Sequence, residues 1–199
     1  MKKFELTNEF IANRFGTKLF RIRALVEFGN VEAGELGGYV EKESNLGHDD
    51  NAWVYGDAQV SGDARVYGNA WVYGDAQVSG DARVYGNAWV YGDAQVSGDA
   101  LVYGNARVCG DARVCGNGDY AYAHGFGSVN RTTTFFRLKD GGVGVRCGCF
   151  YGTLAQFRDK IRETHGETKK AQEYLMLADL MELRFEEDEN EVGNRKYVE

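Results

Sequence analysis

Four cysteines have the widest chemical range of any residues in this chain, because thiolates bind metals and act as nucleophiles. They are Cys109, Cys115, Cys147 and Cys149, with the spacings C-x5-C and C-x-C. In structural zinc sites, about two to four residues separate paired cysteines, and neither spacing fits. Cys109 and Cys115 also stand one six-residue unit apart in the repeat described below, which places them on different faces. We therefore expect no metal site and reduced cysteines that serve as small apolar fillers.

A second group of chemically capable side chains follows residue 119, where polar residues surround a glycine-rich stretch. Arginine suits anionic groups because its planar guanidinium donates two parallel hydrogen bonds. No G-x-x-x-x-G-K-[ST] nucleotide motif is present, and an ordinary polar face of a sheet is the alternative. The predicted site for a small anionic ligand consists of His124, Arg131, Thr133, Arg137 and Arg146.

Charge and composition limit the partners of the chain. A formal net charge of −7 argues against a nucleic-acid binder that neutralises phosphates. Ladders of the seven aspartates between residues 51 and 118 could imitate nucleic-acid phosphates, but Asx side chains at corners have a local role in turns.

No apolar run approaches the ~18 residues of a membrane span, and MKKFELTNEF lacks the apolar segment of a secretory signal. We expect a cytoplasmic protein without a membrane partner and without direct nucleic-acid binding.

A repeat that dominates the sequence must position these residues. Residues 51–68 read NAWVYGDAQVSGDARVYG, residues 69–86 are identical, and residues 87–104 differ only at Leu101. Each unit holds three hexads of the form (D/N)-A-x-V-x-G, which continue in degraded form to residue 118. Valine favours extended backbone and fills the interior, while glycine and Asx residues favour corners. Three strands and three corners per unit predict a mainly β chain with a three-sided parallel β-helix over residues 51–118.

In every hexad an aliphatic residue stands four positions before a small one, as in Val54 with Ala58, Val60 with Ala64 and Val66 with Ala70. This pattern resembles the hexapeptide-repeat superfamily, and the resemblance implies a left-handed parallel β-helix. Enzymes of that superfamily are acyltransferases that use a histidine base on or near the coils. No residue from 51 to 118 is histidine, and only His48 lies at the start of the solenoid. Without a base for proton transfer, we expect no catalytic residue and no cofactor, and acyl transfer is the alternative.

Stacking of the coils about 4.8 Å apart turns equivalent outward residues into ladders, and all three tryptophans are expected on the outside of one face. Tryptophan and tyrosine dominate binding hot spots, and so large an apolar patch is unusual on a monomer. The alternative is a passive ladder, copied by duplication and stabilised by ring stacking. The predicted face for a protein partner or for a second copy of the chain consists of Trp53, Tyr55, Trp71, Tyr73, Trp89 and Tyr91.

The open ends of a solenoid expose unpaired strands, so both ends should be covered. Residues 1–50 are predicted to form an N-terminal β cap and a first irregular coil. Residues 119–199 are predicted to form a small α+β domain, which could dock where Arg107 and Cys109 replace the tryptophan and tyrosine of earlier coils. Its expected parts are two strands around the turn Asp140-Gly141-Gly142, a helix from the capping box Thr153–Gln156 to Gly166, a second helix over 169–184, and an acidic tail, Glu186–Glu191.

The C-terminal stretch GFGSVNRTTTFFR, CGCFYGTL and EYLMLADLMEL, together with the whole layout, resembles uncharacterised proteins of bacteriophages and prophages. That resemblance implies action on a host protein or a host signalling molecule in the host cytoplasm, with a role in countering host defence. We therefore predict a non-enzymatic binding protein that presents an aromatic face and a C-terminal domain. The alternatives are a hexapeptide acyltransferase and a structural module that self-assembles into a homo-oligomer.

Overall fold

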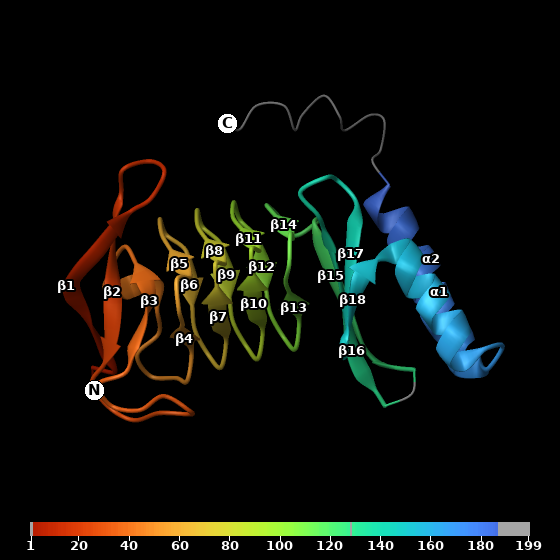
Figure 1. The fold of residues 1–199 in the computed structure, drawn as a ribbon, viewed down its shortest axis with the longest axis horizontal. Helices are drawn as coiled ribbons and strands as arrows, with labels where there is room; N and C mark the ends of the chain where they lie inside the picture. Colours follow the sequence, from red (N-terminus) through yellow and green to blue (C-terminus); the bar gives the residue numbers. More distant parts are fainter. Residues whose placement is uncertain (1, 128, 187–199) are drawn as a thin grey trace.

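The computed structural model describes residues 2–127 and 129–186. Its centre is a three-sided parallel β-solenoid, as the repeat predicts (Figure 1). Strands of successive coils pair in parallel and in register, so that Trp71 lies beside Trp53 and Trp89. The solenoid strands are β4 (Trp53–Val54), β5 (Gln59–Val60), β6 (Arg65–Val66), β7 (Trp71–Gly74), β8 (Gln77–Val78), β9 (Arg83–Val84), β10 (Trp89–Gly92), β11 (Gln95–Val96), β12 (Leu101–Val102), β13 (Arg107–Val108) and β14 (Arg113–Val114).

One valine and one alanine from each hexad fill the interior of the solenoid, and each is at most 1% exposed. The corners are held by glycines with positive φ. At Gly80 (φ +67°), a Cβ atom would lie 2.9 Å from the backbone nitrogen of Gly98 in the next coil. The coils therefore stack closely only because these corners carry no side chain.

One of the three corners is also bonded along the solenoid axis. The side-chain nitrogen of Asn51 donates to Asn69 Oδ1 at 3.1 Å, and the same bond joins Asn69 to Asn87 and Asn87 to Asn105. We expected corner Asx side chains to bond within their own turn, but these amides bond between coils instead. An amide can do so because it carries both a donor and an acceptor, whereas an ionised aspartate only accepts.

The N-terminal region continues one of the solenoid sheets. Strands β1 (Phe4–Ala12) and β2 (Lys18–Ala24) form an antiparallel hairpin, and β3 (Leu36–Val40) connects β2 to β5 of the solenoid. A short 3-10 helix, η1 (Glu43–Asn45), precedes Leu46, which bridges to Val66. Val40 and Leu46 are both buried, so the irregular first coil that their six-residue spacing predicts is present.

The C-terminal region is an antiparallel sheet covered by two helices. The predicted strand pair around Asp140-Gly141-Gly142 is present, and two further strands that we did not anticipate flank it. The helices lie on the far side of this sheet from the solenoid (Figure 1). The elements are β15 (Tyr120–Phe126), β16 (Arg131–Arg137), β17 (Val143–Cys147), β18 (Phe150–Thr153), α1 (Leu154–His165) and α2 (Lys169–Phe185).

Local sequence signals set the ends of α1. Thr153 and Gln156 form the expected capping box, and Gly166 ends the helix with φ +56°. In the predicted acidic tail Glu186–Glu191, the positions from 187 onward lie outside the described residues. In the described part of the chain, neither helix is long and apolar enough to cross a membrane.

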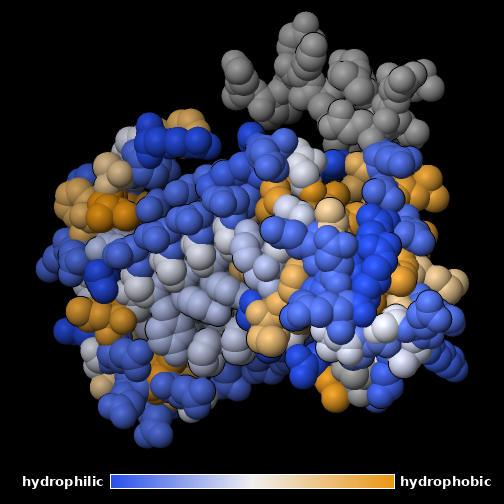
Figure 2. Space-filling view, turned by 45° about the vertical axis from the view of Figure 1, so that its right-hand side comes forward, coloured by the Kyte–Doolittle hydropathy of each residue, from blue (hydrophilic) through white to orange (hydrophobic). Residues whose placement is uncertain are grey.

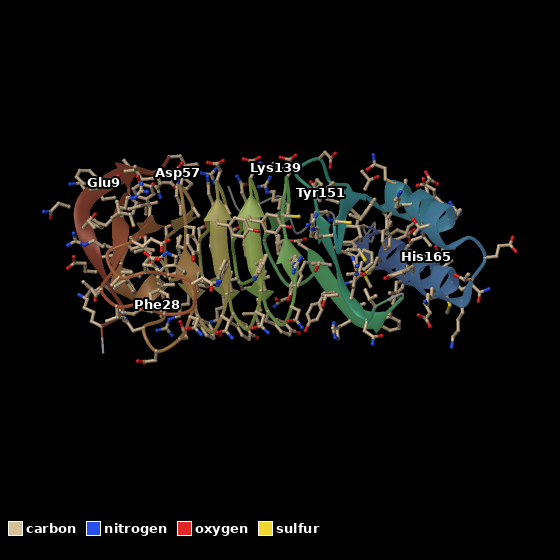
Figure 3. All side chains as sticks on the ribbon, turned by 60° about the horizontal axis from the view of Figure 1, so that its bottom comes forward. Glu9, Phe28, Asp57, Lys139, Tyr151 and His165 are labelled. Atoms are coloured by element: carbon tan, nitrogen blue, oxygen red, sulfur yellow. The ribbon has the colours of Figure 1, made fainter. Side chains whose placement is uncertain are left out.

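Alternation along β16 divides the C-terminal sheet between two cores. Phe136 belongs to the core that continues from the solenoid, whereas Phe135 packs with the residues of α1 and α2. Successive side chains of a strand point to opposite faces, so two adjacent phenylalanines serve two different cores. Lys139 and Tyr151 lie at the same boundary (Figure 3), where Lys139 pairs with Asp111 of the last coil at 3.5 Å.

We expect Val72→Asp to cost several kcal/mol and to unfold the protein, because it buries a charge among interior valines. Gln77→Asp on the exposed surface should change the free energy of unfolding by no more than about 0.5 kcal/mol. Denaturant unfolding followed by circular dichroism measures both variants. Equal destabilisation would show that the assignment of inward and outward residues is wrong.

Candidate functional site

A pocket of about 470 Å³ lies where the last coil meets the C-terminal sheet, and we call it the junction pocket. The solenoid contributes a corner residue and the first residue of β13. The C-terminal region contributes residues of β15 and β16 and the turn between β17 and β18. The lining residues are Asn105, Arg107, His124, Arg131, Thr132 and Gly148.

Two of the lining residues are arginines, and no lining residue is acidic. Among the described residues, neither Arg107 nor Arg131 makes a salt bridge, so no carboxylate in that part of the chain neutralises their charges. His124 Nδ1 lies 2.9 Å from Thr132 Oγ1, which fixes the imidazole at the rim. The pocket therefore offers donors and positive charge to an anion.

Backbone geometry positions both guanidinium groups. The backbone N–H of Arg107 donates to Thr134 Oγ1 at 2.9 Å, which ties β13 to β16. The Arg107 guanidinium lies 4.6 Å from the centre of the Trp89 ring. Gly148 has φ +59°, and a Cβ atom there would lie 1.9 Å from Arg131 Nη1, so the missing side chain leaves the space that Arg131 occupies.

Of the five residues in the predicted anionic-ligand site, the structure brings only His124 and Arg131 together in this pocket. Thr133 is buried and donates to Cys147 Sγ at 3.2 Å. Arg137 lies over the ring of Phe185 and donates to the Gly141 carbonyl at 3.2 Å. The structure therefore does not bring all five together in one pocket, because Thr133 and Arg137 lie on the face of β16 that packs against the helices.

Arg146 is also outside the junction pocket. Its Nη1 donates to the Cys149 carbonyl at 3.3 Å, and its Nε is buried without a hydrogen-bond partner. The predicted site left out Asn105, Arg107 and Thr132, which line the pocket. Asn105 and Arg107 belong to the repeat, which gave no reason to group them with residues after 119. The one available signal was the change from tryptophan to Arg107 in the last coil.

The four cysteines do not gather. Cys109 is buried, Cys115 and Cys149 are exposed, and all four are free thiols. Burial raises the pKa of the Cys109 thiol, an effect that its hydrogen bond with Tyr91 and the nearby Arg146 partly offset. Within the described ranges, no three residues of the types His, Cys, Asp and Glu are placed to hold a metal ion.

The aromatic ladder is present, and side chains of successive coils line up in rows along the solenoid (Figure 2). The rings of Trp71 and Trp89 stack with centroids 5.7 Å apart, and those of Tyr73 and Tyr91 stack at 4.8 Å. Rings stacked in this way use their faces on each other and present mainly their edges to solvent.

The expected exposure of all three tryptophans is wrong for Trp53, which is 0% exposed. Phe28 packs against its ring at a centroid distance of 5.3 Å and Phe4 at 6.2 Å. Phe28 comes from the N-terminal region that lies over this end of the solenoid (Figure 3). Trp71 and Trp89 are half-buried, so two of the three tryptophans stay partly accessible.

The tyrosines of the ladder, Tyr55, Tyr73 and Tyr91, are all half-buried. Tyr55 packs between Trp53 and Trp71. Burial raises the pKa of Tyr91, which lies beside the buried Cys109. Cys109 is buried at the end of the solenoid where β13 is bonded to β16 of the C-terminal region.

His48, the histidine at the start of the solenoid, is held by structural contacts. Its ring stacks on Phe4 with centroids 4.4 Å apart. Its Nδ1 accepts the backbone N–H of Lys3 at 3.2 Å, and its Nε2 lies 4.0 Å from Glu43. The backbone therefore occupies Nδ1, and Nε2 is the ring nitrogen that lies toward the Glu43 carboxylate.

These observations define a parallel β-solenoid built from hexapeptide-like repeats and joined to a small α+β unit. Residues 58–74, 76–92 and 94–110 match a family model described as YdcK β-solenoid repeat. The protein described as uncharacterized acetyltransferase YdcK of Escherichia coli (strain K12) is 34% identical over 82 residues. The match covers 34% of this chain and 25% of the relative. This chain therefore spans about a quarter of the relative's length.

The different burial of equivalent tryptophans predicts different stabilities for their alanine variants. Trp53→Ala should cost about 3–5 kcal/mol, because it leaves a cavity beneath the N-terminal strands. Trp71→Ala should cost only about 1 kcal/mol, mainly from lost ring contacts. Denaturant midpoints of the two variants compare them directly. Similar costs would contradict the covering of Trp53.

Proposed function

We propose that this chain is a non-enzymatic binding protein in which the solenoid is a rigid scaffold and the junction pocket holds a small anionic ligand. The observation that carries the proposal is the pair Arg107 and Arg131, two guanidinium groups in one pocket without an acidic lining residue. Phosphate and carboxylate groups match the paired donors of guanidinium. The proposed ligand therefore carries at least one such group.

The way these arginines are held supports binding. The stacking of Arg107 on Trp89 and the cradle for Arg131 at Gly148 restrict both side chains before any ligand arrives. A preorganised pair loses little conformational entropy when it binds, which increases the affinity that a few hydrogen bonds can provide.

We expect Arg107→Ala to weaken the binding of pyrophosphate about tenfold or more, equivalent to about 1.4 kcal/mol. The matched control is Arg113→Ala, which removes an exposed arginine from the next face of the same coil. Isothermal titration calorimetry with pyrophosphate and inorganic phosphate measures both variants. Absence of binding to the unmodified chain, or equal weakening by both variants, would contradict the proposal.

Acyl transfer is a second candidate, because the matched relative is described as an acetyltransferase. The stacked and hydrogen-bonded His48 weighs against it as a base. His124 is the histidine that lines the junction pocket. The non-enzymatic proposal does not need either imidazole as a proton acceptor.

We expect His48→Ala to leave acetyl-coenzyme A binding and turnover unchanged, because the proposed function includes no acyl transfer. Saturable binding of acetyl-coenzyme A that His48→Ala abolishes would instead support the enzyme. Release of free coenzyme A thiol measures turnover, and His124→Ala is the companion variant for the junction pocket. Turnover that depends on His124 would place the acyltransferase site there.

The resemblance to bacteriophage and prophage proteins supports the remaining part of the proposal, a host protein or a host signalling molecule as the partner in the host cytoplasm. The half-buried part of the aromatic ladder is the proposed contact face, and it consists of Tyr55, Trp71, Tyr73, Trp89 and Tyr91. The same face is proposed for self-association into a homo-oligomer. A role in countering host defence stays a prediction from the resemblance, as does the left-handed sense of the helix.

A further inference from the structure

A second pocket, which we call the helix pocket, lies between the turn joining β17 to β18 and the helices, and it has a volume of about 240 Å³. Residues of β16, the turn, both helices and the start of β18 surround it. The lining residues are Arg131, Cys147, Cys149, Phe150, Phe157, Lys160, Ile161, Thr164, His165 and Tyr174.

The floor of the helix pocket is apolar and aromatic. Phe157 and Ile161 of α1 are 3% and 4% exposed, so they belong to the core of the C-terminal unit. The ring of Phe150 lies 5.4 Å from that of Phe157, and the ring of Tyr174 lies 5.8 Å from it. Aromatic rings attract other rings in edge-to-face and offset-stacked arrangements, so this floor offers partners to a flat ring.

The rim of the same pocket is basic. Arg131, Lys160 and His165 supply nitrogen donors, and no lining residue is acidic. Lys160 is paired with Glu163 at 2.8 Å, whereas Arg131 and His165 make no salt bridge among the described residues. His165 stacks on Tyr174 with centroids 5.9 Å apart, at the end of the molecule away from the solenoid (Figure 3).

We propose that the helix pocket binds a small aromatic anion, a single ring that carries a phosphate or carboxylate group. The volume of about 240 Å³ leaves room for one substituted ring. The aromatic floor takes the ring, and the basic rim takes the anionic group. This site is separate from the junction pocket, although Arg131 lines both.

Phenyl phosphate is the probe, because it combines one ring with one phosphate. Cys149 lines the pocket and is exposed, so a bound ligand should shield its thiol from alkylation. Cys115 is an exposed thiol on the last coil and serves as an internal control in the same sample. Peptide mass spectrometry after brief treatment with iodoacetamide measures both thiols at once.

We expect phenyl phosphate to slow alkylation of Cys149 about threefold or more while Cys115 reacts unchanged, since thiol reactivity depends on access. Phenol and inorganic phosphate, which each carry half of the ligand chemistry, should protect much less. Equal protection of the two thiols, no protection at all, or protection by inorganic phosphate as strong as by phenyl phosphate would overturn the proposal.

Two variants of α1 test whether the protection of Cys149 comes from a ligand in the helix pocket. Thr164→Phe places a ring at the mouth of the pocket and should abolish the protection of Cys149. Arg162→Phe adds the same ring to the same helix at an exposed position outside the lining, and should preserve it. Loss of protection in both variants, or in neither, would contradict the proposed location.

The junction pocket is tested apart from this site. Arg107 lines only the junction pocket, so Arg107→Ala should leave the protection of Cys149 by phenyl phosphate intact. Loss of protection in Arg107→Ala would assign the ligand to the junction pocket and overturn the helix pocket. Failure of pyrophosphate to bind the unmodified chain would affect only the proposed function.

Discussion

The whole molecule depends on one geometric constraint, which is that every coil must present the same surface to the next. Val54, Val72, Val90 and Val108 lie in register along one sheet because each coil returns after eighteen residues. A slip of one residue would turn an interior valine outward, since side chains alternate along a strand. A uniform ladder repeats its groups on each coil, so a unique site can form only where the repeat ends.

Both ends of the solenoid are covered, and by different means. At the N-terminal end the buried ammonium of Lys3 donates to the Ala52 carbonyl at 2.8 Å and to Asp50, while aromatic rings cover Trp53. Burial lowers the pKa of Lys3. At the C-terminal end Phe136 enters the solenoid core, and the Tyr120 hydroxyl donates to the Leu101 carbonyl. This second boundary leaves room for a pocket with unpaired arginines.

The C-terminal unit thus holds the features that could distinguish one ligand from another. The match to the YdcK β-solenoid repeat ends at residue 110, whereas most lining residues of both pockets come after residue 119. The family-model match therefore covers the solenoid, including Asn105 and Arg107 of the junction pocket. Arg131 lines both the junction pocket and the helix pocket. Its guanidinium occupies the space beside Gly148.

The sequence by itself determined the solenoid, the irregular first coil and the helix that begins at Thr153, because a strict period and local capping signals each depend on neighbouring residues. It also indicated that His124 and Arg131 belong to one polar group. Only the tertiary structure decided that Trp53 is buried, that Thr133 lies on the helix side of β16, and that Arg107 lines the junction pocket. Burial and convergence of this kind arise from contacts between distant segments, and a residue inside a repeat looks the same whether its neighbour is solvent or another domain.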